Sequence, residues 1–143
     1  MSRSLLIALL VMNSGPAFAE WMWIDKGKPG MTIYVNPDTI HHKEHLVTMW
    51  ELFDFETAEY VADTSHLSFK MHSEYDCSGG LKRELGTTFF SGNMGHGKVV
   101  RRYSTKYKWE PIVQGSVNED LWKFACGEQR LTSQLLTVAI ERR

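Results

Sequence analysis

Cys77 and Cys126 are the only two cysteines of the 143-residue chain, and they lie far apart in the sequence. Cysteines of exported proteins commonly form disulfides, because the compartments outside the cytoplasm are oxidising. A disulfide between them would close a loop of about 50 residues and add about 4 kcal/mol to stability. A redox-active pair and a metal site are the alternatives, but there is no C-x-x-C motif and nothing else clusters beside either cysteine. The pair therefore predicts a structural disulfide that joins two distant segments.

The first nineteen residues have the pattern of a secretory signal peptide. Arg3 supplies the positive charge, residues 5–12 (LLIALLVM) form the apolar part, and residues 17–19 (Ala-Phe-Ala) match a cleavage site. The apolar part has about eight residues, whereas a membrane-spanning helix needs roughly 20. We therefore expect a periplasmic or secreted protein without a membrane span, whose mature chain begins at Glu20. An uncleaved N-terminal helix is the alternative.

Residues 20–143 have the size of a single domain with a core of its own. The chain carries 16 Lys and Arg against 17 Asp and Glu, which gives a net charge of −1. This balance argues against a general nucleic-acid-binding protein, because such proteins gain affinity by neutralising phosphates. No repeat or low-complexity segment suggests a second domain.

Most of the mature chain is predicted to form β-strands. The strand expected over residues 46–55 is apolar on both faces, so we expect it to be central and covered on both sides, by a dimer partner or by the C-terminal tail. Residues 66–75 alternate between apolar and polar, which predicts a half-buried antiparallel strand with a solvated outer face. A turn or a short 3₁₀ piece is expected over residues 37–40, and Pro111 predicts an edge position. The other expected strands cover residues 21–25, 31–35, 81–91, 98–105 and 109–113.

One helix is predicted near the C-terminus. Ser116 and Glu119 have the spacing of a capping box, an apolar stripe that includes Cys126 follows, and Gly127 is a natural stop. The expected fold is α+β, with an antiparallel sheet of about five to six strands packed by this helix. The disulfide would then join the helix to the strand end that carries Cys77. Residues 128–143 could form a second helix or a final strand.

No catalytic group stands out. Residues 41–45 match the H-x-x-E-H zinc pattern, but they follow Asn-Pro-Asp and precede a strong strand, so a polar loop is expected instead of a metal-binding helix. His96 lies in a glycine-rich turn that lacks the spacing of a phosphate-binding loop, and a tight turn with positive φ explains it. Since no serine lies in a G-x-S-x-G motif, we expect neither catalytic activity nor a metal or cofactor.

A cationic stretch is the one candidate binding surface. Tyr103, Tyr107 and Trp109 are interleaved with its cations, and such a surface could bind an anionic macromolecule. Arg101 and Arg102 must point to opposite faces unless a bulge intervenes. The alternative is an exposed hairpin that its charges keep soluble. The cations of this stretch are Lys98, Arg101, Arg102, Lys106 and Lys108.

Several short motifs occur in the order found in the surface-adhesin protein E-like domains of Gram-negative bacteria, which the chain resembles. They are Trp23-Ile24, Tyr34–Ile40, Trp50, Ser68, Tyr75–Cys77, Met94–Gly97, Trp109–Ile112, Gly115-Ser116 and Cys126. The resemblance implies a compact α+β domain with the helix tied to the sheet by the disulfide, and it implies the capacity to form a homodimer. The family's named member is a lipid-anchored surface adhesin that binds host matrix proteins. Here the residue directly after the cleavage site is Glu20 and not a cysteine, so surface display through a lipid is not expected.

These patterns lead to two hypotheses about function. The first is an exported, non-enzymatic, adhesin-like module that recognises a protein or another macromolecule of the envelope or matrix. The second is a structural or assembly component of the cell envelope, acting through a homodimer or a hetero-interface at the central strand or the C-terminal tail.

Overall fold

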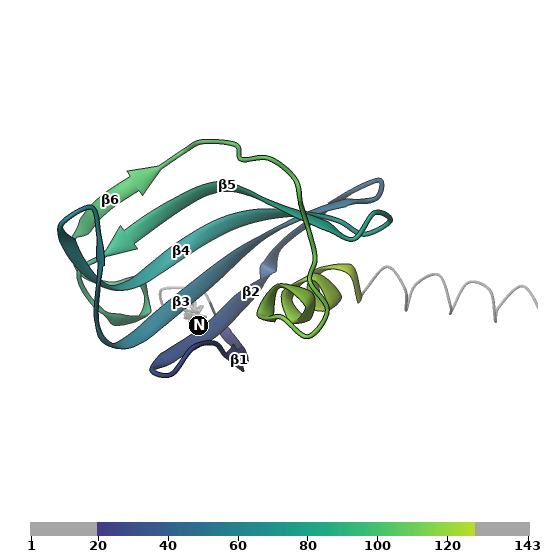
Figure 1. Cartoon of the computed structure of the whole chain (residues 1–143). Helices are drawn as coiled ribbons and strands as arrows, with labels where there is room; N and C mark the ends of the chain where they lie inside the picture. The colour runs from purple at the N-terminus through teal and green to yellow at the C-terminus, as the bar shows by residue number, and fades with distance from the viewer. Residues whose placement is uncertain (1–19, 128–143) are drawn as a thin grey trace, which may run out of the picture.

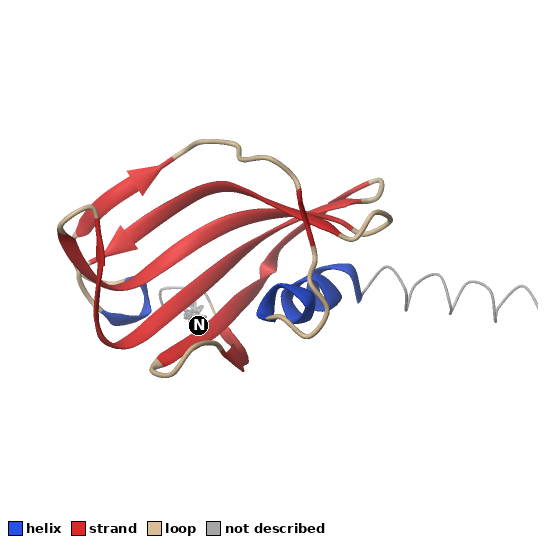
Figure 2. Cartoon of the chain, in the orientation of Figure 1, coloured by secondary structure: helices blue, strands red, loops and turns tan. Residues whose placement is uncertain are grey.

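The computed structural model describes residues 20–127 and consists of one antiparallel sheet with a helix packed against one face (Figures 1 and 2). Consecutive strands are neighbours in the order β1-β2-β3-β4-β5-β6, and the short β7 also pairs with β5. The predicted α+β class is therefore confirmed, with a seven-stranded sheet. The strands are β1 (Met22–Lys26), β2 (Met31–Lys43), β3 (Leu46–Val61), β4 (Thr64–Asp76), β5 (Leu81–Phe90), β6 (Val99–Tyr103) and β7 (Glu110–Pro111), and the helix covers residues 117–127. The predicted signal peptide (residues 1–19) and residues 128–143 lie outside the described residues.

The strands β2 and β3 are longer than the sequence predicted. Each continues past a bulge where the sequence predicted the end of the strand. Asn36 pairs with Trp50 and His41 with Thr48, so β2 has residues 37–40 where β3 has Met49 alone. The expected turn is thus a local detour after which pairing resumes. Side chains within the detour satisfy the displaced backbone: the Thr39 hydroxyl donates to the Asn36 carbonyl at 2.7 Å and accepts the Trp50 N–H at 3.0 Å.

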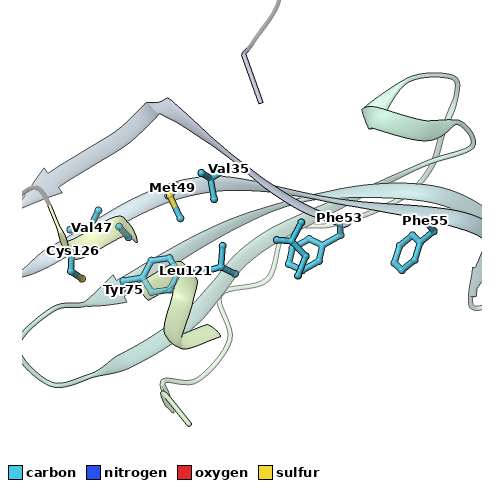
Figure 3. Packing of buried hydrophobic residues seen from close by; sticks show 10 residues of the cluster. Val35, Val47, Met49, Phe53, Phe55, Tyr75, Leu121 and Cys126 are labelled. Carbon is cyan, nitrogen blue, oxygen red and sulfur yellow. The ribbon is translucent and has the colours of Figure 1, made fainter. Parts of the chain in front are cut away.

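The face of the sheet that meets the helix, called the helix face below, carries the core. Alternation along β3 directs Val47, Met49 and Phe53 to this face, where all are buried. Leu121 and Cys126 of the helix pack against them (Figure 3). The predicted division of the central strand into two faces is borne out.

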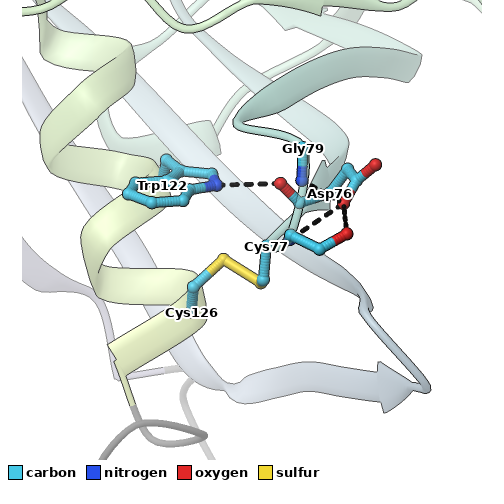
Figure 4. Close-up of a disulfide and its surroundings, with 6 residues drawn as sticks. Asp76, Cys77, Gly79, Trp122 and Cys126 are labelled. Carbon is cyan, nitrogen blue, oxygen red and sulfur yellow. Dashed lines mark hydrogen bonds between the residues drawn. A yellow bond between two sulfur atoms is a disulfide. The ribbon is translucent and has the colours of Figure 1, made fainter.

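The predicted disulfide joins Cys77 to Cys126, with the two Cα atoms 5.6 Å apart (Figure 4). Beside it, the indole N–H of Trp122 donates to the carbonyl of Asp76 at 3.0 Å. The Asp76 carboxylate accepts the backbone N–H of Gly79 at 2.8 Å and lies at the turn that follows β4. The helix is therefore fixed to the end of β4 by a covalent bond and a hydrogen bond.

The helix begins close to where its sequence predicted. The Ser116 hydroxyl accepts the Glu119 N–H at 3.3 Å, whereas the Glu119 carboxylate accepts the N–H of Gly115 instead of that of Ser116. The capping box is therefore present with its second hydrogen bond moved by one residue. Gly127, predicted as the stop, is itself helical and is the last described residue.

The opposite face, called the outer face below, is more covered than predicted. The loop with η1 (Asn93–Gly95) folds over it, and Ser68 donates to the Gly92 carbonyl at 2.6 Å and accepts the Gly95 N–H at 2.9 Å. Ser68 is fully buried as a result, so the expectation of a solvated outer face on β4 is wrong at this end.

The central strand is covered on its outer face by the chain itself. Leu52 of β3 is fully buried and lies opposite Lys70 of β4. The Lys70 ammonium lies 5.6 Å from the Trp21 ring centre and 5.2 Å from that of Phe90, which places these rings over the same region. A dimer partner was one of the two covers expected for this apolar face of the central strand. The burial of Leu52 does not require one.

Candidate binding surface

The chain from β6 to β7 forms one edge of the sheet. Tyr103 pairs with Thr87 and Glu110 with Lys82, and between these pairs the Tyr107 N–H donates to the Glu84 carbonyl at 2.9 Å. Residues 99–111 thus run alongside β5 as one irregular antiparallel segment, which Figure 1 shows returning from β6 toward the helix. Pro111 lies at this edge, as predicted, where its missing N–H breaks no ladder.

Four exposed cations follow this edge, and we call them the cationic edge: Lys98, Arg102, Lys106 and Lys108. None of them forms an ion pair with another residue in the part of the chain that the structure describes. No Asp or Glu occurs between residues 98 and 109, and Tyr107, which lies between two of the lysines, is 50% exposed. The edge therefore presents cations without ion pairs beside an exposed aromatic ring, and Glu84 and Glu110 line a pocket together with Lys108.

Arg101, the fifth cation of the predicted stretch, points elsewhere. Arg101 pairs with Phe89 and Arg102 pairs with Thr88, so their side chains leave the strand on opposite faces. The Arg101 guanidinium lies 5.9 Å from the ring centre of Tyr103, and its Nε atom is buried. Arg101 thus packs against the sheet while Arg102 remains on the exposed outer face.

A hollow of about 350 Å³ lies on the outer face beside the cationic edge. Its floor is at Gly86 of β5, which pairs with His72 of β4 at a bulge and supplies no side chain. A Cβ atom at Gly86 would come within 3.0 Å of the Tyr103 carbonyl oxygen, so glycine also lets β6 approach. The residues that line this outer-face hollow include Trp50, His72, Gly86, Thr88, Arg102 and Ser104.

Two stacked rings form one wall of the hollow. Trp50 and His72 are direct cross-strand partners, and their ring centres lie 4.8 Å apart with an interplanar angle of 9°. Burial lowers the pKa of His72, although Glu74 and Glu51 favour its protonated form. The imidazole is thus held toward its neutral form and offers a flat, mainly apolar surface.

A buried polar cluster on the helix face was not anticipated from the sequence. The Lys82 ammonium lies 3.1 Å from a Glu51 carboxylate oxygen and donates to the Asn118 side-chain carbonyl at 3.0 Å, while the Tyr75 hydroxyl donates to the other Glu51 oxygen. Burial, followed by the charge of Glu51, raises the pKa of Tyr75 well above its ordinary range. The cluster joins β3, β4, β5 and the helix. The sequence did contain one indication of this cluster: Glu51 alternates with Met49 and Phe53, so it lies on the same buried face of β3.

The residues of the H-x-x-E-H pattern do not lie on a helix. Residues 41–43 belong to β2 and residues 44–45 to the following turn, and all five are exposed. Within residues 20–127, no three His, Cys, Asp or Glu side chains converge on a common metal position. The same residues contain no helix long and apolar enough to cross a membrane.

Comparisons with known proteins agree with this architecture. The family model described as "Surface-adhesin protein E" matches residues 21–127. Among solved structures, protein E from non-typeable Haemophilus influenzae has a TM-score of 0.57 and 14% identity, covering 89% of this chain and 92% of that chain. Another structure of Haemophilus influenzae protein E has a TM-score of 0.58 and 13% identity, covering 76% of this chain and 84% of that one. No curated protein matches the chain.

Proposed function

The chain belongs to the surface-adhesin protein E family, and on that premise we propose that it is a non-enzymatic, adhesin-like module that binds a protein or another macromolecule through the cationic edge. The observation that supports this most is the row of four exposed cations that have no acidic partner among the described residues. Exposed cations of this kind attract an anionic partner.

Electrostatics and surface composition suggest the kind of partner. Exposed charges of one sign accelerate the encounter with a macromolecule of opposite charge and orient it. Tyr107 adds an exposed ring beside Lys106 and Lys108, and aromatic residues are enriched at protein interfaces. An acidic protein surface or another polyanion of the envelope or matrix fits this edge.

A matched pair of charge-reversal variants tests the proposal. Lys106→Glu/Lys108→Glu changes the cationic edge, and Lys26→Glu/Lys43→Glu makes the same change in net charge at exposed lysines elsewhere. Binding to immobilised extracellular-matrix extract and to cell-envelope extract is measured at low and high salt. We expect the first variant to lose at least about tenfold in affinity at low salt, which corresponds to about 1.4 kcal/mol. Equal losses in both variants would contradict a specific role for this edge.

A role as a structural or assembly component of the envelope is the second candidate. The opposite edge of the sheet is β1, where Met22 and Trp23 are 47% and 56% exposed. Exposed apolar side chains on an edge strand are suited to pairing with another sheet. Light scattering tests whether two copies of the chain pair through this edge, which a monomer would contradict.

A further inference from the structure

We propose that the outer-face hollow binds one sugar ring of an acidic saccharide, with the carboxylate of a uronic acid held by Arg102. This inference deepens the proposed function, on which it rests, because Arg102 belongs to both the hollow and the cationic edge. The hollow also includes residues of β3, β4 and β5 that do not belong to the cationic edge.

The apolar side of the hollow follows from the strand pairing. His72 lies between Trp50 on β3 and Gly86 on β5. One face of the imidazole stacks on the Trp50 indole, so the other face turns toward β5 and the hollow that His72 and Gly86 line. A flat group with an apolar face can lie in that space against the imidazole. The C–H face of a pyranose ring has this shape and polarity.

The polar side of the hollow is cationic and rich in hydroxyl groups. Arg102 is exposed and makes no ion pair with another described residue, and the described residues that line the hollow include no acid. Thr88 and Ser104 provide hydroxyl groups that can hydrogen-bond to sugar hydroxyls. A guanidinium forms paired hydrogen bonds with a carboxylate, which favours an acidic sugar over a neutral one.

Size and surroundings agree with a short saccharide. The hollow of about 350 Å³ is at the small end of the range of small-molecule sites, which is about 300–1,000 Å³. Lys106 follows Ser104 by two residues, so their Cα atoms are at most about 7 Å apart. The next acidic sugar of a chain that occupies the hollow can therefore meet the lysines of the cationic edge.

Calorimetric titration with three probes tests the ligand class. The probes are a hyaluronan tetrasaccharide, the same tetrasaccharide with its carboxyl groups reduced to alcohols, and tetraglutamate. We expect the acidic tetrasaccharide to bind at least about tenfold more tightly than either of the others. In NMR spectra, it should also shift the indole N–H resonance of Trp50. Equal binding of tetraglutamate would show attraction by charge alone and overturn the inference.

Variants of the hollow separate this inference from the proposed function. Thr88→Val keeps the shape of the side chain and removes its hydroxyl group, so we expect a loss of about fivefold in affinity for the acidic tetrasaccharide. His72→Ala removes the wall and should cost more, while Lys26→Gln serves as the control with unchanged affinity. If Lys106→Glu/Lys108→Glu lowers binding to the extracts but Thr88→Val and His72→Ala leave tetrasaccharide binding unchanged, the hollow is not the site and the proposed function stands. If the extract binding is also unaffected, both fail.

Discussion

The two faces of this sheet are built from the same alternating strands, yet they differ in what covers them. On the helix face, a disulfide, a buried ion pair and a helix close the core over Val47 and Met49. On the outer face, the loop at η1 and the rings around Lys70 cover part of the sheet, and Gly86 leaves a hollow beside exposed cations. We infer that the helix face maintains the fold and that the outer face is available for binding.

The largest effect is expected from the disulfide. Cys77→Ser/Cys126→Ser opens a loop with a sequence separation of 49 residues, and the chain-entropy estimate for such a loop is about 4 kcal/mol. Urea unfolding of residues 20–143, with and without the substitutions, measures the difference. A change below about 1 kcal/mol would show that the helix is held by other contacts.

The buried ion pair should have the next largest effect. Glu51→Ala leaves the Lys82 ammonium without its carboxylate, while the Lys82 side chain is only 11% exposed. Removing one partner of a buried pair costs about 3–5 kcal/mol, and we expect about 3 kcal/mol here because Asn118 still contacts Lys82. Lys28→Ala, which removes an exposed ion pair with Glu59, is the control and should cost less than about 1 kcal/mol. Similar losses in the two variants would contradict the account of the cluster.

Acidification should destabilise the protein through His66. This histidine is 4% exposed and packs against Phe55 and Phe89, and burial lowers its pKa below the ordinary value of 6.5. The unfolded chain therefore binds a proton more readily than the folded one, so stability is present above pH 6.5 and is lost as the pH falls toward the lowered pKa. Urea unfolding at pH 7.5 and pH 5.5 measures the loss. His66→Leu should reduce the difference, and an unchanged difference would contradict the role of His66.

The smallest effects on stability are expected at the cationic edge. Arg102→Gln and Lys106→Gln remove exposed charges without ion pairs, so each should change the free energy of unfolding by less than about 0.5 kcal/mol. Thermal unfolding provides the measurement. A loss above about 1.5 kcal/mol in either variant would mean that the cationic edge serves the fold.

The sequence predicted the features that depend on local chemistry. Strand alternation identified the two faces of β3. The spacing of Ser116 and Glu119 located the start of the helix. The presence of only two cysteines in an exported chain predicted the disulfide between them. The bulge at residues 37–40 looked like a turn because the same side-chain hydrogen bonds stabilise both. The residues of this segment alone do not distinguish a turn from a bulge. The bulge is defined by the pairing of His41 with Thr48, which resumes after it.

Features that depend on distant pairing could not be predicted. The ion pair of Glu51 with Lys82 and the hollow at Gly86 both require the register of β5 against β4, which shifts at a bulge between His72 and Ser73. The candidate binding residues were identified by their charge and by the aromatic residues between them. The sequence also predicted that Arg101 and Arg102 point to opposite faces unless a bulge intervenes, and the observed pairing has no bulge between them.

The most direct test of the division between the two faces is the calorimetric affinity of Lys106→Glu/Lys108→Glu for the hyaluronan tetrasaccharide, compared with that of Lys26→Glu/Lys43→Glu. Our account predicts that the first variant binds at least about tenfold more weakly while both unfold with the same free energy. Equal affinities in the two variants would contradict the assignment of binding to the cationic edge and the outer face beside it.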